Sequence, residues 1–379
     1  MATILNRNWD SSAAALFCGE ELGLADYVNI LFKRLEELAL LQRSQFWVET
    51  EISMDADKKQ WPTLNLVTQE ITLLNLGWQT MADSFITRAP ESCIAPLVSR
   101  PELEGMLIQW SYFENIHSRA YSNFIRNVLP NPSEFIDSVM HSEEAFARIA
   151  SSIDVLDKLA VKAEEFCKIR DAEVRNTILY EQVREETMEL LLEAYFAIYA
   201  LEAMMFYASF SCTFALAEND ILLGLAKTLQ LIAKDEALHT VMSKEIITIL
   251  YQQMPADVVE RVKRKAPQIL RQVLQTEINW GRFLFDGGRR KIIGLNEELL
   301  EEYLYYIGRL AFEYIGIPWP SDLPVITKHP IPWIEFWLKS DKQQVAPQEI
   351  QLTNYRVGQI ESASEEAVDD LNNEFEGMF

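Results

Sequence analysis

Two copies of a Glu-x-x-His motif constrain this chain more than any other feature of its sequence. One runs from Glu114 to His117 in YFENIHSRAY, and the other from Glu236 to His239 in KDEALHTVM. Residues three apart on a helix lie on one face, so each motif offers a carboxylate and an imidazole to the same point. Two such motifs, with one carboxylate from each of two further helices, form a known template by which four-helix bundles hold two metal ions.

The apolar pattern predicts an all-α protein. Glycine and proline are few, at 13 and 14 among 379 residues, and we find no alternating strand pattern of useful length. Pro101 suits the first turn of a helix, and Pro130 stops the same helix. We expect helices over residues 26–45, 63–86, 101–129, 133–160, 175–216, 219–253, 257–285 and 296–315.

The stretch from residue 190 to 218 is apolar enough to resemble a membrane span. Glu202 lies in its middle, where an unpaired charge in lipid would be costly, and both flanks are acidic without a cluster of lysine or arginine. A helix that is apolar all round in a soluble protein is a central core helix. We therefore expect a core helix in which Glu202 faces a cation.

The overall composition narrows the partners and the compartment. A formal net charge of −23 disfavours nucleic acid and anionic membranes, because both would repel the chain. The four cysteines are far apart and form no CxxC pair, which favours free thiols in a reducing cytosol. The N-terminus shows no signal peptide pattern, so we expect a cytoplasmic protein.

The remaining ligands must come from the helices over 63–86 and 175–216. Glu202 is the only glutamate in the apolar run after Glu193. Asp83 and Glu70 are both candidates on the other helix, and we favour Asp83 because its neighbours are uncharged. Tyr121 lies four residues after His117, on the same face of the helix, so its phenol should lie close to the metals.

The composition changes near residue 340, which divides the chain into a helical metal-binding domain (1–340) and a tail (341–379). The tail has nine acidic residues against Lys342 and Arg356, and it should be flexible when alone. It ends in NEFEGMF, whose spaced apolar residues suit a groove on a partner. A tail that merely improves solubility is the alternative.

Several longer motifs carry a family resemblance. They are ADSF around Asp83, ENIHSRAY, LEAMMFYASFSCTFALAE, AKDEALH, IPWIEFWL and VAPQEIQLTNYRVGQI. Over essentially its whole length the chain resembles the small, radical-generating subunit of class I ribonucleotide reductase. The resemblance implies a ferritin-like helical bundle, with a dinuclear metal-carboxylate centre ligated by Asp83, Glu114, His117, Glu202, Glu236 and His239.

The same resemblance implies the chemistry and the partners. The centre, with two iron ions or with manganese in place of one or both, would use O2 to form a radical on Tyr121. Trp47 and Asp235 would pass the oxidant outward, and Tyr355 in the tail would relay it to a large subunit that reduces ribonucleotides to deoxyribonucleotides. The tail would dock that large subunit, and the small subunit would be a homodimer.

Two other classes of protein use similar ligands. A stand-alone ferritin-like oxidase or desaturase would explain the six ligands, but it gives no role to Tyr121 or to a tail with Tyr355. An iron-storage protein would be a much shorter chain. A purely structural helical scaffold would leave Glu202 buried without a partner.

Overall fold

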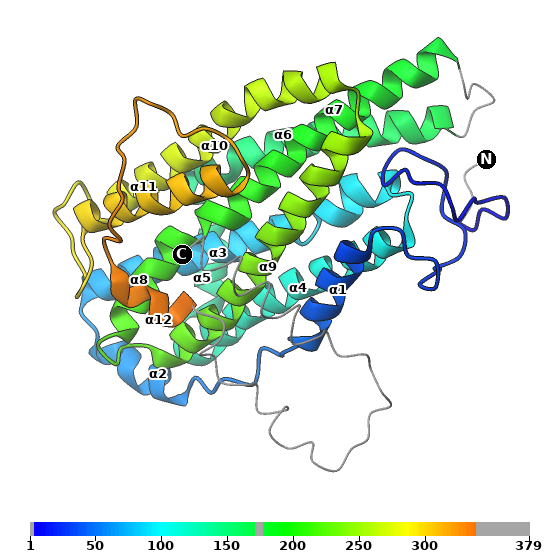
Figure 1. Ribbon diagram of the computed structural model, residues 1–379. Helices are drawn as coiled ribbons and strands as arrows, with labels where there is room; N and C mark the ends of the chain where they lie inside the picture. Colours follow the sequence, from blue (N-terminus) through cyan, green and yellow to red (C-terminus); the bar gives the residue numbers. More distant parts are fainter. Residues whose placement is uncertain (1–3, 171–176, 339–379) are drawn as a thin grey trace.

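The computed structural model describes residues 4–170 and 177–338, and over these ranges the protein is helical (Figure 1). Strand-like pairing in this part of the chain is limited to two isolated bridges, Phe17 with Val98 and Ile292 with Leu295. The prediction of an all-α protein is therefore confirmed. Most of the long helices lie side by side along roughly one direction.

The helices begin and end as follows. The α-helices are α1 (Lys33–Ser44), α2 (Asp55–Gln60), α3 (Leu66–Ile86), α4 (Pro101–Val128), α5 (Pro132–Val139), α6 (Glu143–Arg170), α7 (Ile178–Ala200), α8 (Tyr207–Ala217), α9 (Leu223–Gln253), α10 (Ala256–Leu284), α11 (Glu297–Tyr314) and α12 (Glu335–Leu338). Short 3-10 turns are η1 (Trp61–Thr63), η3 (Ala95–Leu97) and η5 (Pro332–Ile334), and π-helical turns are η2 (Pro90–Ile94) and η4 (Leu201–Met205).

The apolar stretch that resembles a membrane span lies in the core. It continues through α7, η4 and α8, and α7 packs against α6, α9 and α10. Ile178–Ala217 is long and apolar enough to cross a membrane, yet 89% of its most apolar window is buried inside the protein. The prediction of a core helix is confirmed, with one addition: Glu202 lies in the π-helical turn η4.

Two predicted helices differ from the structure for local reasons. The helix expected from residue 26 begins at Lys33, because the Asp26 carboxylate accepts hydrogen bonds from the backbone N–H groups of Val28 and Asn29 and holds a turn. The helix expected over 133–160 is two helices, α5 and α6. Residues 140–142 separate them, and the Ser142 hydroxyl accepts a hydrogen bond from the N–H of Ala145 in the first turn of α6.

The last described helix, α12, packs against the end of α8. In α12 the indole N–H of Trp337 donates to Glu218 at 2.8 Å, and its ring stacks on Phe214 with centroids 5.4 Å apart. The tail over 341–379 lies outside the described residues.

Helix α2, which no sequence pattern predicts, caps the start of α9. The Asp57 carboxylate accepts hydrogen bonds from the backbone N–H groups of Gly224 at 3.0 Å and Leu225 at 2.7 Å. N–H groups in the first turn of a helix have no acceptor within the helix. Asp57 therefore stabilises the N-terminus of α9, the helix that carries Glu236 and His239.

Replacing Asp57 with alanine should lower the free energy of unfolding by about 1–2 kcal/mol, because α9 loses its cap. Asp55→Ala, an exposed position in the same short helix, is the matched control and should change the free energy by less than about 0.5 kcal/mol. Urea unfolding followed by circular dichroism measures both. Equal effects of the two substitutions would contradict the capping role.

Candidate metal centre

Four elements bring the six candidate ligands to one place in the core. Helices α4 and α9 each carry a Glu-x-x-His motif, α3 contributes Asp83, and η4 contributes Glu202. None of the six side chains is exposed to solvent: Asp83, Glu114, His117, Glu202, Glu236 and His239.

The six residues form two ligand groups that share two glutamates. Within each group the ligand atoms lie within 4.8 Å of one another. The first group is Asp83, Glu114, His117 and Glu236, and the second is Glu114, Glu202, Glu236 and His239.

Each shared glutamate faces both imidazoles. Glu114 turns Oε1 to Nδ1 of His239 at 2.9 Å and Oε2 to Nδ1 of His117 at 3.4 Å. Glu236 turns Oε1 to Nδ1 of His117 and Oε2 to Nδ1 of His239, both at 3.2 Å. Glu114 and Glu236 would therefore hold metal ions together with both imidazoles.

Unsatisfied oxygens indicate that the groups suit cations. Both carboxylate oxygens of Asp83 and both of Glu202 are buried and accept no well-formed hydrogen bond from the part of the chain that the structure describes. Burying a carboxylate without a partner is costly, whereas a bound cation would balance it. Carboxylate oxygen with imidazole nitrogen is a donor set that suits iron and manganese.

The pKa values reflect the same crowding of charge. Burial raises the pKa of Asp83 and of Glu202, and the neighbouring carboxylates Glu114 and Glu236 add to the effect. Burial alone would lower the pKa of His239, but Glu114 and Glu236 outweigh it and raise that pKa to about 9. Burial would raise the pKa of Glu236, but the two imidazoles outweigh it and lower that pKa.

The structure also separates the two candidates on α3. Asp83 is buried in the first ligand group. The Glu70 carboxylate lies at the surface and pairs with Arg290 at 3.0 Å, with about half of its side chain exposed (49%). Glu70 is therefore a surface charge.

Comparison with known proteins identifies the family. The family model described as "Ribonucleotide reductase, small chain" matches residues 25–319. The ribonucleoside-diphosphate reductase 1 subunit beta of Escherichia coli O157:H7 is 34% identical over 372 residues, which cover 96% of each chain. This chain belongs to the ribonucleotide reductase small-chain family.

Two solved structures support the fold of this small chain. The ribonucleotide reductase R2 subunit from Clostridium botulinum has a TM-score of 0.74 at 23% identity, over 89% of this chain and 98% of that one. The dimanganese(II)-NrdF of Streptococcus sanguinis has a TM-score of 0.57 at 18% identity, over 83% of this chain and 98% of that one. The prediction of a ferritin-like bundle is confirmed.

A second layer of side chains in the small chain holds the ligands, and the sequence patterns do not predict it. The ring of Trp110 stacks on His239 with centroids 4.6 Å apart, and its N–H donates to Glu114 at 3.0 Å. The amide of Gln42 contacts Nε2 of His239 at 2.6 Å, and an amide oxygen there would accept the ring N–H. Trp110 lies four residues before Glu114, so helical spacing could have found it; Gln42 has no such signal.

Asp235 connects the candidate centre to Trp47. Oδ2 of Asp235 accepts a hydrogen bond from the indole N–H of Trp47 at 2.8 Å and lies 3.0 Å from Nε2 of His117. All three side chains are buried. Hydrogen bonds through Asp235 therefore link the candidate ligand His117 to Trp47 in the small chain.

Tyr121 is buried beside the first ligand group. Burial raises the pKa of its phenol, and the charges of Asp83, Glu236 and Glu114 raise it further. The phenol is therefore protonated at neutral pH. Tyr355 lies outside the described residues.

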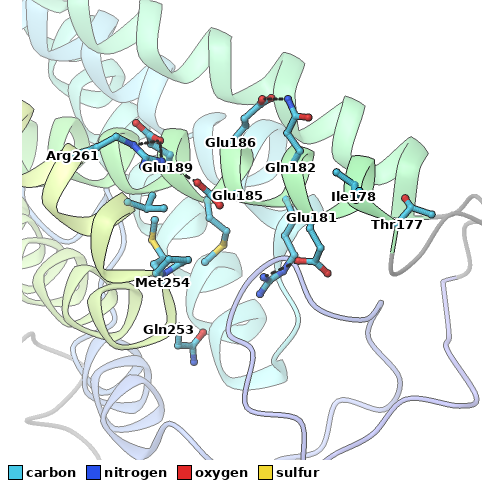
Figure 2. A pocket seen from close by; sticks show the side chains of 14 residues that line it. Thr177, Ile178, Glu181, Gln182, Glu185, Glu186, Glu189, Gln253, Met254 and Arg261 are labelled. Carbon is cyan, nitrogen blue, oxygen red and sulfur yellow. Dashed lines mark hydrogen bonds and ion pairs between the residues drawn. The ribbon is translucent and has the colours of Figure 1, made fainter.

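A surface pocket of about 680 Å³ is separate from the candidate centre (Figure 2). It lies where the start of α7 meets the turn between α9 and α10, and none of the six ligands lines it. Glu185 and Glu189 in its wall pair with Arg261 at 3.0 and 2.8 Å. We assign this pocket no part in metal binding.

The metal affinity of the small chain should increase with pH up to about pH 9. Below that pH the metal-free protein holds a proton on His239, whose pKa is about 9, and a metal ion must displace it. Each displaced proton should contribute up to about a tenfold gain in affinity per pH unit. Anaerobic Mn(II) titrations from mildly acidic to mildly basic pH measure the slope. An affinity that does not change with pH would contradict this proton coupling.

Proposed function

We propose that this small chain is the radical-generating beta subunit of a class I ribonucleoside-diphosphate reductase, an oxidoreductase that is active only with a large subunit. The observation that carries the proposal is the pair of ligand groups sharing Glu114 and Glu236, with Tyr121 buried beside them. The E. coli relative is named as the beta subunit of such a reductase. The holoenzyme would reduce ribonucleotides to deoxyribonucleotides.

The six ligands would hold two metal ions, and we assign two iron ions. When bound, these ions would supply, with O2, the one-electron oxidising power that amino-acid side chains lack. The donor set also suits manganese or one ion of each kind, and the S. sanguinis relative is named as a dimanganese(II) protein.

Tyr121 would store the oxidising equivalent. Its phenol is fully buried and keeps its proton in the resting protein, so one-electron oxidation would remove an electron and that proton together. The absence of solvent exposure would protect the resulting phenoxyl radical from reduction.

Trp47 and Asp235 would carry the equivalent away from the centre. The hydrogen bonds of Asp235 with Trp47 and His117 allow an electron and a proton to move along one chain of contacts. Tyr355 in the tail would pass the equivalent to the large subunit, which the tail docks. We also propose a homodimer in the cytoplasm, without nucleic acid or membrane as partners.

Family membership favours this function over the two alternatives. A stand-alone oxidase or desaturase could use the same ligand groups, but it would give no role to the link from His117 to Trp47. An iron-storage protein would need neither that link nor a buried Tyr121.

Reconstitution with Fe(II) and O2 should produce a tyrosyl radical that electron paramagnetic resonance detects, and Tyr121→Phe should remove it while both metals still bind. Tyr195→Phe, at an equally buried tyrosine on α7, is the control and should keep the radical. A radical of unchanged intensity in Tyr121→Phe would exclude Tyr121. A radical that forms only with manganese and an activating partner would keep Tyr121 and overturn the assignment of iron.

Two variants of the tail should separate docking from radical transfer. Deleting residues 360–379 should leave metal binding and the Tyr121 radical intact but abolish binding to the large subunit. Tyr355→Phe should keep the complex and abolish turnover, because phenylalanine is not oxidised at a comparable potential. Pull-down and ribonucleotide reduction assays with the large subunit measure both. Full turnover by either variant would contradict the role assigned to that part of the tail.

A further inference from the structure

An arginine on a helix without ligands contacts the turn that carries Glu202. Arg148 of α6 is buried, and its guanidinium pairs with the buried carboxylate of Glu277 on α10 through Nε and Nη2. Neither α6 nor α10 contributes a residue to the two ligand groups. The pair nevertheless lies against η4.

The guanidinium donates to both sides of the junction between η4 and α8. Nη2 donates a hydrogen bond to the backbone carbonyl of Met205, the last residue of η4. Nη1 donates to the hydroxyl of Ser209 in the first turns of α8, at 3.2 Å. Arg148, which lies on α6, thus contacts the end of the π-helical turn η4 from a neighbouring helix.

Aromatic and amide side chains fix the guanidinium in place. Its central carbon lies 3.4 Å from the ring centroid of Trp78 and 4.9 Å from that of Trp280. The Asn75 side-chain oxygen accepts hydrogen bonds from Ser209 at 3.0 Å and from the indole N–H of Trp280 at 3.1 Å. Helices α3, α6, α8 and α10 therefore meet at Arg148.

A π-helical turn needs such support more than an α-helix does. Isolated π-turns are rare, and they often occur at functional sites. Because an α-helix advances about 100° per residue, loss of the extra residue in the turn would rotate Glu202 relative to α8 by roughly that angle. Glu202 would then leave the second ligand group.

We propose that Arg148, held by Glu277, is a positioning residue that sets the shape of η4 and thereby places Glu202 in the second ligand group. The inference rests on the proposed function, since it concerns the same two-metal centre. Stability alone gives a weak reason for the pair, because a buried ion pair can often be replaced by apolar residues at little cost.

The test is anaerobic Mn(II) binding, with electron paramagnetic resonance counting the free ion. In the double variant Arg148→Met/Glu277→Gln, which removes both charges, one of the two bound ions should be weakened about 10- to 100-fold, as substitutions that support metal ligands typically do. The other ion should keep its parental affinity. The residual Mn(II) spectrum should match that of Glu202→Ala and differ from that of Asp83→Ala.

A second buried ion pair provides the matched control. Arg100 and Glu102 are equally buried, and they lie 3.3 Å apart at the start of α4, away from η4. Arg100→Met/Glu102→Gln removes the same charges and should keep both ions at parental affinity, whatever its melting temperature. Equal loss of metal in the two double variants would overturn the proposal, because it would indicate general loosening of the core.

A milder pair of variants keeps the test informative if the double variant does not fold. Ser209→Ala removes one contact of Arg148 and should weaken the same ion to a smaller extent. Ser211→Ala removes a serine whose hydroxyl donates to the Tyr207 carbonyl of its own helix, and this variant should bind both ions with parental affinity. Parental binding of both ions by the Arg148 and Ser209 variants would overturn this inference alone. A parent chain that binds no second ion would overturn the proposed function, and this inference with it.

Discussion

Four carboxylates and two imidazoles share one solvent-free place in the core, and the rest of the molecule is arranged around that charge. Without cations, burial and the mutual charges shift the pKa values of several of these groups. Asp83 and Glu202 are pushed toward their protonated forms, while Glu236 stays ionised between two imidazoles. Two bound metal ions would displace those protons, and their positive charge would balance the buried carboxylates.

Side chains outside the two ligand groups contact the candidate ligands and the elements that carry them. Asp57 caps α9, and Trp110 and Gln42 orient His239. Arg148 and Glu277 lie on helices that contribute no candidate ligand, and Arg148 contacts the turn that carries Glu202. Helices that carry no candidate ligand therefore help to position the candidate ligands, in addition to forming part of the core.

The candidate centre is connected to Trp47, whereas Tyr121 is isolated from solvent. Asp235 links His117 to Trp47 by hydrogen bonds, whereas the phenol of Tyr121 lies in a region without solvent exposure. A protein that stores an oxidant and releases it on demand needs both features. The radical-generating function gives a role to both features, whereas metal storage gives a role to neither.

The sequence by itself determined the features that depend on local spacing. Helical periodicity predicted the all-α class, and the i, i+3 spacing placed Glu114 with His117 and Glu236 with His239. Charge and burial logic predicted that the apolar run around Glu202 lies in a core. The sequence favoured Asp83 over Glu70, and the tertiary structure shows how the environments of these two α3 residues differ. Asp83 is buried in the first ligand group, whereas Glu70 pairs with Arg290 at the surface. The tertiary structure alone revealed the π-turn at Glu202, which lies within one continuous apolar run that helical periodicity reads as a single helix. It also revealed the cap from Asp57 and the contacts of Gln42 and Arg148, because each of these joins residues far apart in the chain, and no periodicity records such contacts.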